Sequence, residues 1–93
     1  MKENEYRKLI QEAIAPFGAT LLELVYSRRF FGNITLKIVD ANKETHEYTL
    51  DRGDIYVGSI LFLAHNEYNL KTKEHFFDKL VQCIIQDLSL FKK

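Results

Sequence analysis

The chain has 93 residues, of which 46% are hydrophobic and 28% are charged, as in ordinary globular domains. Lys and Arg number 13 and Asp and Glu also number 13, which excludes a net field that attracts the whole molecule to a polyanion. One cysteine excludes an internal disulfide, and no apolar run approaches the roughly 20 residues that span a bilayer. Because the first residues lack a signal-peptide pattern, we expect a single cytoplasmic α+β domain, residues 1–93, without membrane contact.

The first predicted element is an amphipathic helix. Its apolar face consists of Tyr6, Leu9, Ile10, Ala13, Ile14 and Phe17, which recur at helical spacing. Pro16 disfavours helical geometry at the residue before it, and Gly18 follows, so the helix should end there.

Three segments with alternating apolar residues follow, and each predicts a β-strand. The residues expected to share one face are Leu22, Leu24 and Tyr26 in segment 20–28, Ile34, Leu36 and Ile38 after Gly32-Asn33, and His46, Tyr48 and Leu50 after a polar turn at 40–43.

The next turn contains Arg52-Gly53-Asp54, a familiar cell-adhesion tripeptide. Adhesive use requires an extracellular loop, and nothing in the sequence argues for secretion, so a structural turn is favoured. Asp51-Arg52-Gly53 has the order of a three-residue hairpin loop with glycine at a position of positive φ. We expect Asp51 to accept local hydrogen bonds rather than to share a cation with Asp54.

The segment 55–63 predicts an apolar hairpin around a two-residue turn at Gly58-Ser59. In this register Val57 pairs with Ile60 and Ile55 with Phe62, which places four apolar side chains on one face. That consistency favours two short strands over one long strand with a bulge. The hairpin then needs a helix or a partner to cover it.

The last predicted element is a helix that begins after the N-cap candidate Thr72, with Glu74 in its first turn. Its apolar residues span about 180° of the helical wheel, wider than the roughly 100° that one packing surface needs. They are Phe76, Phe77, Leu80, Val81, Ile84, Ile85, Leu88 and Phe91. This helix should therefore contact the sheet and, in addition, either the first helix or another subunit.

All predicted strand connections are short, which implies antiparallel neighbours. The expected fold is α+β: an N-terminal helix, a four- or five-stranded antiparallel meander sheet, and a C-terminal helix, with both helices on one face of the sheet.

Two groups of residues are candidates for partner binding. Arg28, Arg29, Phe30 and Phe31 combine guanidinium groups with aromatic rings, which suits single-stranded nucleic acid or a protein interface, although the neutral charge argues against nucleic acid. Glu44, Glu47, Asp51 and Asp54 lie in or beside the central hairpin, where they form either a solvated face or a negative patch for a basic partner.

No catalytic, cofactor or metal site is predicted. His46, His65 and His75 are widely separated, lack the spacing of a helical zinc site and are interpreted as surface residues. Cys83 is interpreted as a small buried residue rather than a nucleophile. The sequence also lacks a P-loop, a dinucleotide fingerprint and a nucleophile elbow.

Small size and the lack of catalytic motifs favour a non-enzymatic protein-binding module, such as an immunity, inhibitor or mobile-element protein. Its partner would be another protein or a second copy in a homodimer. The alternative is single-stranded nucleic-acid binding through residues 28–31.

Overall fold

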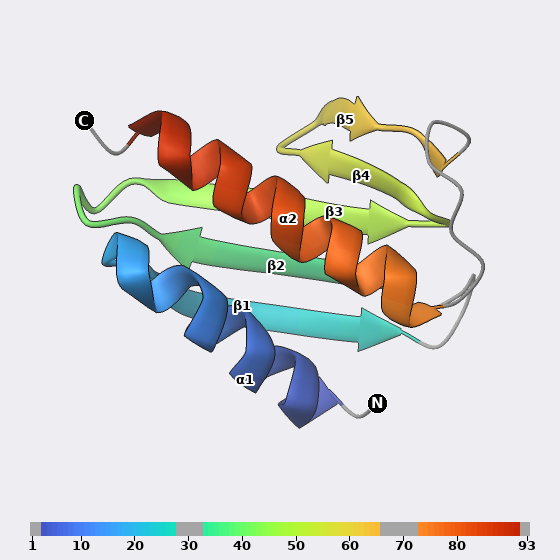
Figure 1. Cartoon of the computed structure of the whole chain (residues 1–93), viewed down its shortest axis with the longest axis horizontal. Helices are drawn as coiled ribbons and strands as arrows, with labels where there is room; N and C mark the ends of the chain where they lie inside the picture. Colours follow the sequence, from blue (N-terminus) through green and yellow to red (C-terminus); the bar gives the residue numbers. More distant parts are fainter. Residues whose placement is uncertain (1–2, 28–32, 66–72, 92–93) are drawn as a thin grey trace.

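The computed structural model describes residues 3–27, 33–65 and 73–91. The elements are α1 (Glu3–Ile14), the 3-10 helix η1 (Ala15–Phe17), β1 (Thr20–Ser27), β2 (Asn33–Val39), β3 (Thr45–Asp51), β4 (Asp54–Val57), β5 (Ile60–Leu63) and α2 (Lys73–Phe91). The five strands form one antiparallel sheet in the order β1-β2-β3-β4-β5, and both helices lie on one face of it (Figure 1). The predicted α+β meander is therefore confirmed, with five strands.

The first helix ends where the sequence predicts. Pro16 lies in η1, and Gly18 follows it with a φ of 73°, in the left-handed region. The N–H of Gly18 donates to the carbonyl oxygen of Ala15 at 2.9 Å. This reversal directs the chain from α1 into the edge strand β1.

The hydrophobic core fills the space between the sheet and the two helices. Tyr6 of α1 is buried there, with its ring 4.9 Å from that of Tyr26 in β1 and 4.6 Å from that of Phe77 in α2. Helix α2 packs on both α1 and β3. The wide apolar arc of α2 therefore packs on α1 as well as on the sheet. The width of this arc is no longer a reason to expect another subunit.

The predicted face pattern of β1 is wrong at Leu22. The pairing with β2 shifts register between Leu21 and Glu23, which marks a β-bulge. Because the bulge adds one residue, Leu21 packs on the core together with Leu24, whereas Leu22 is exposed. The unbroken strands β2 and β3 follow the predicted alternation, with Ile34, Leu36, Ile38, Tyr48 and Leu50 buried.

The turn between β3 and β4 has two residues, not the predicted three. Asp51 pairs with Asp54, and the central residues Arg52 and Gly53 have φ values of 54° and 85°. Two consecutive positive φ values are typical of a type I′ turn, whose twist matches that of a β-hairpin. The tripeptide Arg52-Gly53-Asp54 is a hairpin corner, as expected, and Asp54 begins β4.

The hairpin β4–β5 exists, with Gly58-Ser59 in its turn and Val57 paired with Ile60, as predicted. The predicted pairing of Ile55 with Phe62 is wrong, because the register shifts and Ile55 pairs with Leu63. Leu63 therefore packs on the core, whereas Phe62 remains exposed. Two short strands joined by a turn at Gly58-Ser59, which the sequence favoured over one long strand with a bulge, are therefore confirmed.

Within the described residues, neither helix is both long enough and apolar enough to cross a membrane.

Candidate functional site

The basic and aromatic segment 28–31 lies outside the described residues. The role of Arg28, Arg29, Phe30 and Phe31 in nucleic-acid or protein binding therefore stays a prediction.

The four carboxylates considered as an acidic patch lie in separate places. Glu44 precedes β3, whereas Asp51 and Asp54 face each other at the opposite end of that strand. Glu47 lies between them on the face away from the helices, where its carboxylate is 3.9 Å from the ammonium of Lys37. The structure does not bring the four side chains together in one surface.

Two of these carboxylates help to hold the turn between β3 and β4 in place. Asp51 accepts a hydrogen bond from the side-chain amide of Asn33 at 3.0 Å. Asp54 accepts one from the backbone N–H of His65 at 2.7 Å and contacts the imidazole of His65 at 2.8 Å. These hydrogen bonds keep the pKa of Asp54 below its usual value.

The sheet has two edges, and helix α1 closes the first of them. Glu3, Arg7 and Gln11 are spaced four residues apart, so they lie in one row on α1. They bond to backbone groups of β1 and of Ala19, the residue before it. The hydrogen bonds are Tyr26 N–H to Glu3 Oε1 at 3.1 Å, Arg7 Nη2 to Leu24 O at 2.8 Å, Leu21 N–H to Gln11 Oε1 at 2.9 Å, and Gln11 Nε2 to Ala19 O at 3.4 Å. This edge cannot pair with another strand without losing these bonds.

The second edge, β5, has no such cover in the described part of the chain. Strand β5 ends the sheet and pairs with β4 alone, and no side chain within residues 3–27, 33–65 and 73–91 bonds to the backbone of Ile60–Leu63. In Figure 1, α2 crosses above β2 and β3, and β5 lies beyond the helical layer.

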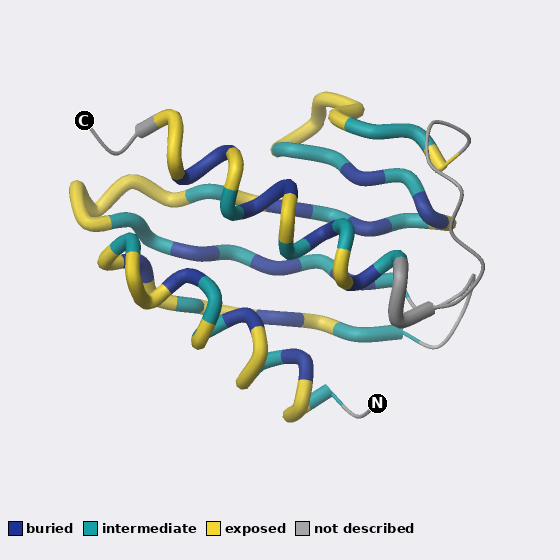
Figure 2. Tube along the Cα trace, in the orientation of Figure 1, coloured by how far each residue is buried: buried dark blue, intermediate teal, exposed yellow. Residues whose placement is uncertain are grey.

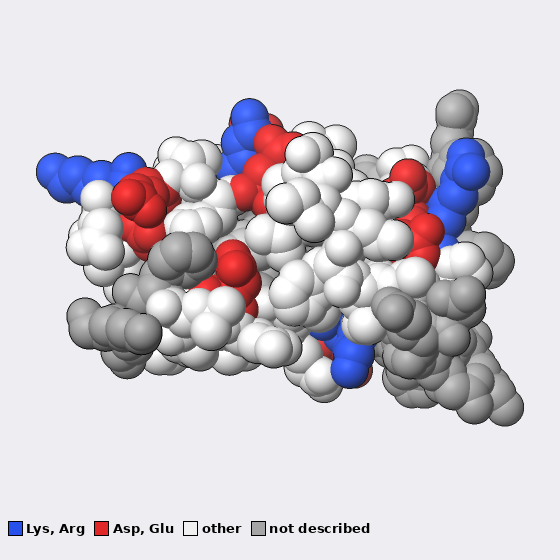
Figure 3. All heavy atoms as spheres, turned by 90° about the horizontal axis from the view of Figure 1, so that it is seen from above, with Lys and Arg blue, Asp and Glu red and all other residues white. Residues whose placement is uncertain are grey.

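The first three residues of β5 are apolar but exposed (Figure 2). Ile60 is 73% exposed, Leu61 50% and Phe62 40%. Ile60 lies on the face of its partner Val57, toward the helices, and Leu61 lies on the opposite face. In the view from the side of β5, the middle of the visible surface is mainly uncharged, with acidic groups beside it (Figure 3). An open edge with apolar side chains on both faces is a natural site for another strand.

A second group of polar residues lies at the other end of the sheet, around His46. The side chain of His46 is 12% exposed, so its interpretation as a surface histidine is wrong. Its Nε2 is 2.8 Å from the Oδ2 of Asp40, and its Nδ1 is 3.9 Å from the Oδ2 of Asp87 in α2. The hydroxyl of Tyr48 donates to the same oxygen of Asp87 at 2.5 Å.

The environment of this group fixes the charge states of two of its members. The hydrogen bond from His46, supported by the backbone N–H groups of Glu44 and Asn42, lowers the pKa of Asp40. Burial, together with the hydrogen bond to Asp87, raises the pKa of Tyr48 far above its usual value. Asp40 is therefore a carboxylate and Tyr48 a neutral donor at physiological pH.

Sequence reasoning missed this group, although one signal for it was present. His46 was correctly placed on the same face as Tyr48 and Leu50, the face that packs on the helices. Asp87 is a charged residue beside the buried Leu88 within the apolar arc of α2. A histidine and an aspartate that both face one core are expected to meet, because a buried charge needs a partner.

Cys83 is buried, as predicted, and burial raises the pKa of its thiol. A raised pKa disfavours the thiolate, which is the nucleophilic form.

No protein-family model, curated protein or solved structure matches this chain. The functional interpretation therefore rests on the geometry of the described residues.

Proposed function

We propose that this protein is a non-enzymatic protein-binding module that takes up an extended segment of another protein as an additional strand on β5. The observation that carries the proposal is the contrast between the two edges of the sheet. Polar side chains of α1 close the β1 edge, whereas the β5 edge exposes Ile60, Leu61 and Phe62.

Hairpin geometry makes Leu61 the central residue of this edge. In a hairpin with a two-residue turn, the residues that flank the turn exchange hydrogen bonds, here Val57 and Ile60. The next pair, Tyr56 and Leu61, is then a non-hydrogen-bonded pair, so the backbone N–H and C=O of Leu61 point away from β4. They are available to an incoming strand.

The composition and length of β5 define the partner. The strand Ile60–Leu63 carries no charge and only apolar side chains, so it suits an uncharged, apolar segment in an extended conformation. Four residues are far fewer than the roughly 20 to 30 residues that each side of a stable protein interface contributes. A short segment of another protein is therefore favoured over a second copy of the whole domain.

Selection from a phage-displayed library of eight-residue peptides tests this function. We expect the wild-type protein to enrich uncharged apolar peptides, and the bound peptide to shift the amide NMR signals of residues 60–63. Leu61→Lys should weaken binding of the selected peptide at least tenfold, because an edge lysine opposes strand addition.

Val25→Lys is the matched control. Val25 is 60% exposed and lies in the same cross-strand row as Leu61, but on the closed β1 edge. Equal loss of binding in the two variants would contradict the proposal, as would the absence of any enriched peptide. Self-association of the wild type in sedimentation equilibrium, abolished by Leu61→Lys, would instead identify a second copy as the occupant.

A further inference from the structure

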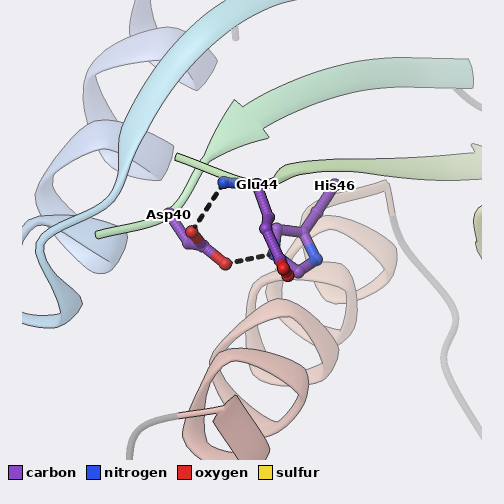
Figure 4. A group of neighbouring side chains, drawn as sticks. All are labelled: Asp40, Glu44 and His46. Carbon is purple, nitrogen blue, oxygen red and sulfur yellow. Dashed lines mark hydrogen bonds and ion pairs between the residues drawn. The ribbon is translucent and has the colours of Figure 1, made fainter. Parts of the chain in front are cut away.

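Three side chains with metal-binding atoms converge where β2 turns into β3. One ligand atom from each of Asp40, Glu44 and His46 lies within 4.8 Å of the other two. Figure 4 shows the three side chains pointing toward one another above the α2 ribbon. They combine one imidazole nitrogen with two carboxylates, a set of donors that suits zinc and related ions.

Local structure holds two of these donors in position. The Oδ1 of Asp40 accepts hydrogen bonds from the N–H groups of Asn42 at 2.8 Å and Glu44 at 2.9 Å, which leaves Oδ2 directed at His46. His46 lies in β3 with its ring enclosed against the helices. Glu44 is exposed, so its carboxylate can move closer to Asp40 and His46 without rearrangement of the core.

An independent observation comes from α2, on the other side of the imidazole. The Oδ2 of Asp87 lies 3.9 Å from the Nδ1 of His46, and Asp87 as a residue is only 8% exposed. Tyr48 holds the same carboxylate by a hydrogen bond. A histidine that binds a metal through one nitrogen usually directs its other N–H to a carboxylate, which orients the ring. Asp87 lies on that side of the ring, at an ion-pair distance that is longer than a hydrogen bond.

We propose that Asp40, Glu44 and His46 form a binding site for one divalent transition-metal ion of the zinc type, with Asp87 on the far side of the His46 ring. The ligands are the Oδ2 of Asp40, a carboxylate oxygen of Glu44 and the Nε2 of His46, and water completes a tetrahedral shell. The ion takes the place of the direct contact between Nε2 and Oδ2, and the imidazole binds it in the neutral form, with its N–H on Nδ1 on the side of Asp87.

The chain contains a matched histidine for comparison. His65 makes the same 2.8 Å contact with Asp54, but its side chain is exposed, and within the described residues Asp54 is its one ion-pair partner. If a single histidine–aspartate contact were sufficient for binding, both sites would take up metal. The proposal predicts that the site at His46 alone does so.

Calorimetric titration of the EDTA-treated full chain with Zn²⁺ tests the proposal, together with the visible absorption of Co²⁺. We expect one equivalent of Zn²⁺ to bind, and one equivalent of Co²⁺ to bind with the spectrum of a tetrahedral ion. Glu44→Gln and His46→Gln should each weaken binding at least tenfold, whereas His65→Gln should have no effect.

Glu44 is exposed, so Glu44→Gln should fold normally. This variant therefore tests the metal site even if His46→Gln does not fold. Weak binding of several ions by the wild type would overturn the proposal. So would unchanged binding in Glu44→Gln, or loss of binding in His65→Gln. Because the site lies away from β5, Glu44→Gln should also leave peptide binding unchanged, so the two proposals can fail separately.

Discussion

At Gly53, turn geometry and packing both require glycine. Its φ of 85° lies in the left-handed region, and a Cβ atom there would be 2.9 Å from the Cβ of His65 and 3.0 Å from the ring of Phe76. Gly58 has a φ of 63° in the next turn, but a Cβ there would meet nothing within 4 Å. An alanine at Gly58 would therefore introduce backbone strain alone, whereas an alanine at Gly53 would introduce backbone strain and a steric clash.

We expect Gly58→Ala to lower the free energy of unfolding by about 1 kcal/mol through backbone strain alone. Gly53→Ala should cost about 1–3 kcal/mol more, because the added methyl group displaces the packed ring of Phe76. Urea denaturation of both variants measures the difference. Equal losses of unfolding free energy in the two variants would show that His65 and Phe76 move aside for the added methyl group without measurable cost.

At the scale of single elements, the accuracy of the sequence predictions follows the regularity of strand pairing. Strands β2 and β3 pair without a register shift, so simple alternation identified their buried residues. Bulges interrupt the pairing of β1 with β2 and of β4 with β5. They leave Leu22 and Phe62 exposed, although simple alternation places both side chains on an apolar face. A bulge depends on the partner strand, and the residues of one strand alone do not reveal it. The row of polar residues that closes β1 was missed because its hydrogen bonds join α1 to β1, and the sequence of α1 alone does not show which strand lies beside it.

The closure of β1 by α1 gives a test at this scale. Gln11→Ala removes the acceptor for the N–H of Leu21 and should lower the free energy of unfolding by about 1 kcal/mol. Glu12→Ala, at an exposed neighbouring position, should change it by less than about 0.5 kcal/mol. Both variants introduce the same helix-favouring residue, so urea denaturation compares them directly. Faster amide exchange at Leu21 in Gln11→Ala alone would confirm which bond is lost.

At the scale of the whole molecule, the order of elements and the antiparallel topology were predictable, because short connections leave few alternatives. The candidate sites were not. The open character of β5 depends on how far α2 extends over the sheet, and the group around His46 joins β3 to α2, which are distant in sequence. Asp40 and Asp54 are charged acceptors beside the two ends of β3. Asp40 accepts from backbone N–H groups within its own turn, whereas Asp54 accepts from the N–H of the more distant His65.

The lowered pKa values of Asp40 and Asp54 determine how their contribution to stability depends on pH. Both have a lowered pKa in the folded state, so the unfolded chain binds protons more readily in acid. Their contribution is fully present above the unfolded pKa of about 4 and is lost as the pH falls through the lower folded values. The free energy of unfolding of the metal-free protein should therefore fall below about pH 4 as both ends of β3 lose their charged acceptors.

Asp54→Asn isolates one of the two carboxylates. The variant should be less stable than the wild type at pH 7, because its neutral amide accepts a weaker hydrogen bond from the N–H of His65. As the pH falls through the folded pKa of Asp54, the wild type loses the same charge, so the difference between the two proteins should shrink. Urea denaturation of both proteins from pH 7 to pH 2.5 follows this convergence. A difference that stays constant over that range would mean that the charge of Asp54 does not stabilise the turn.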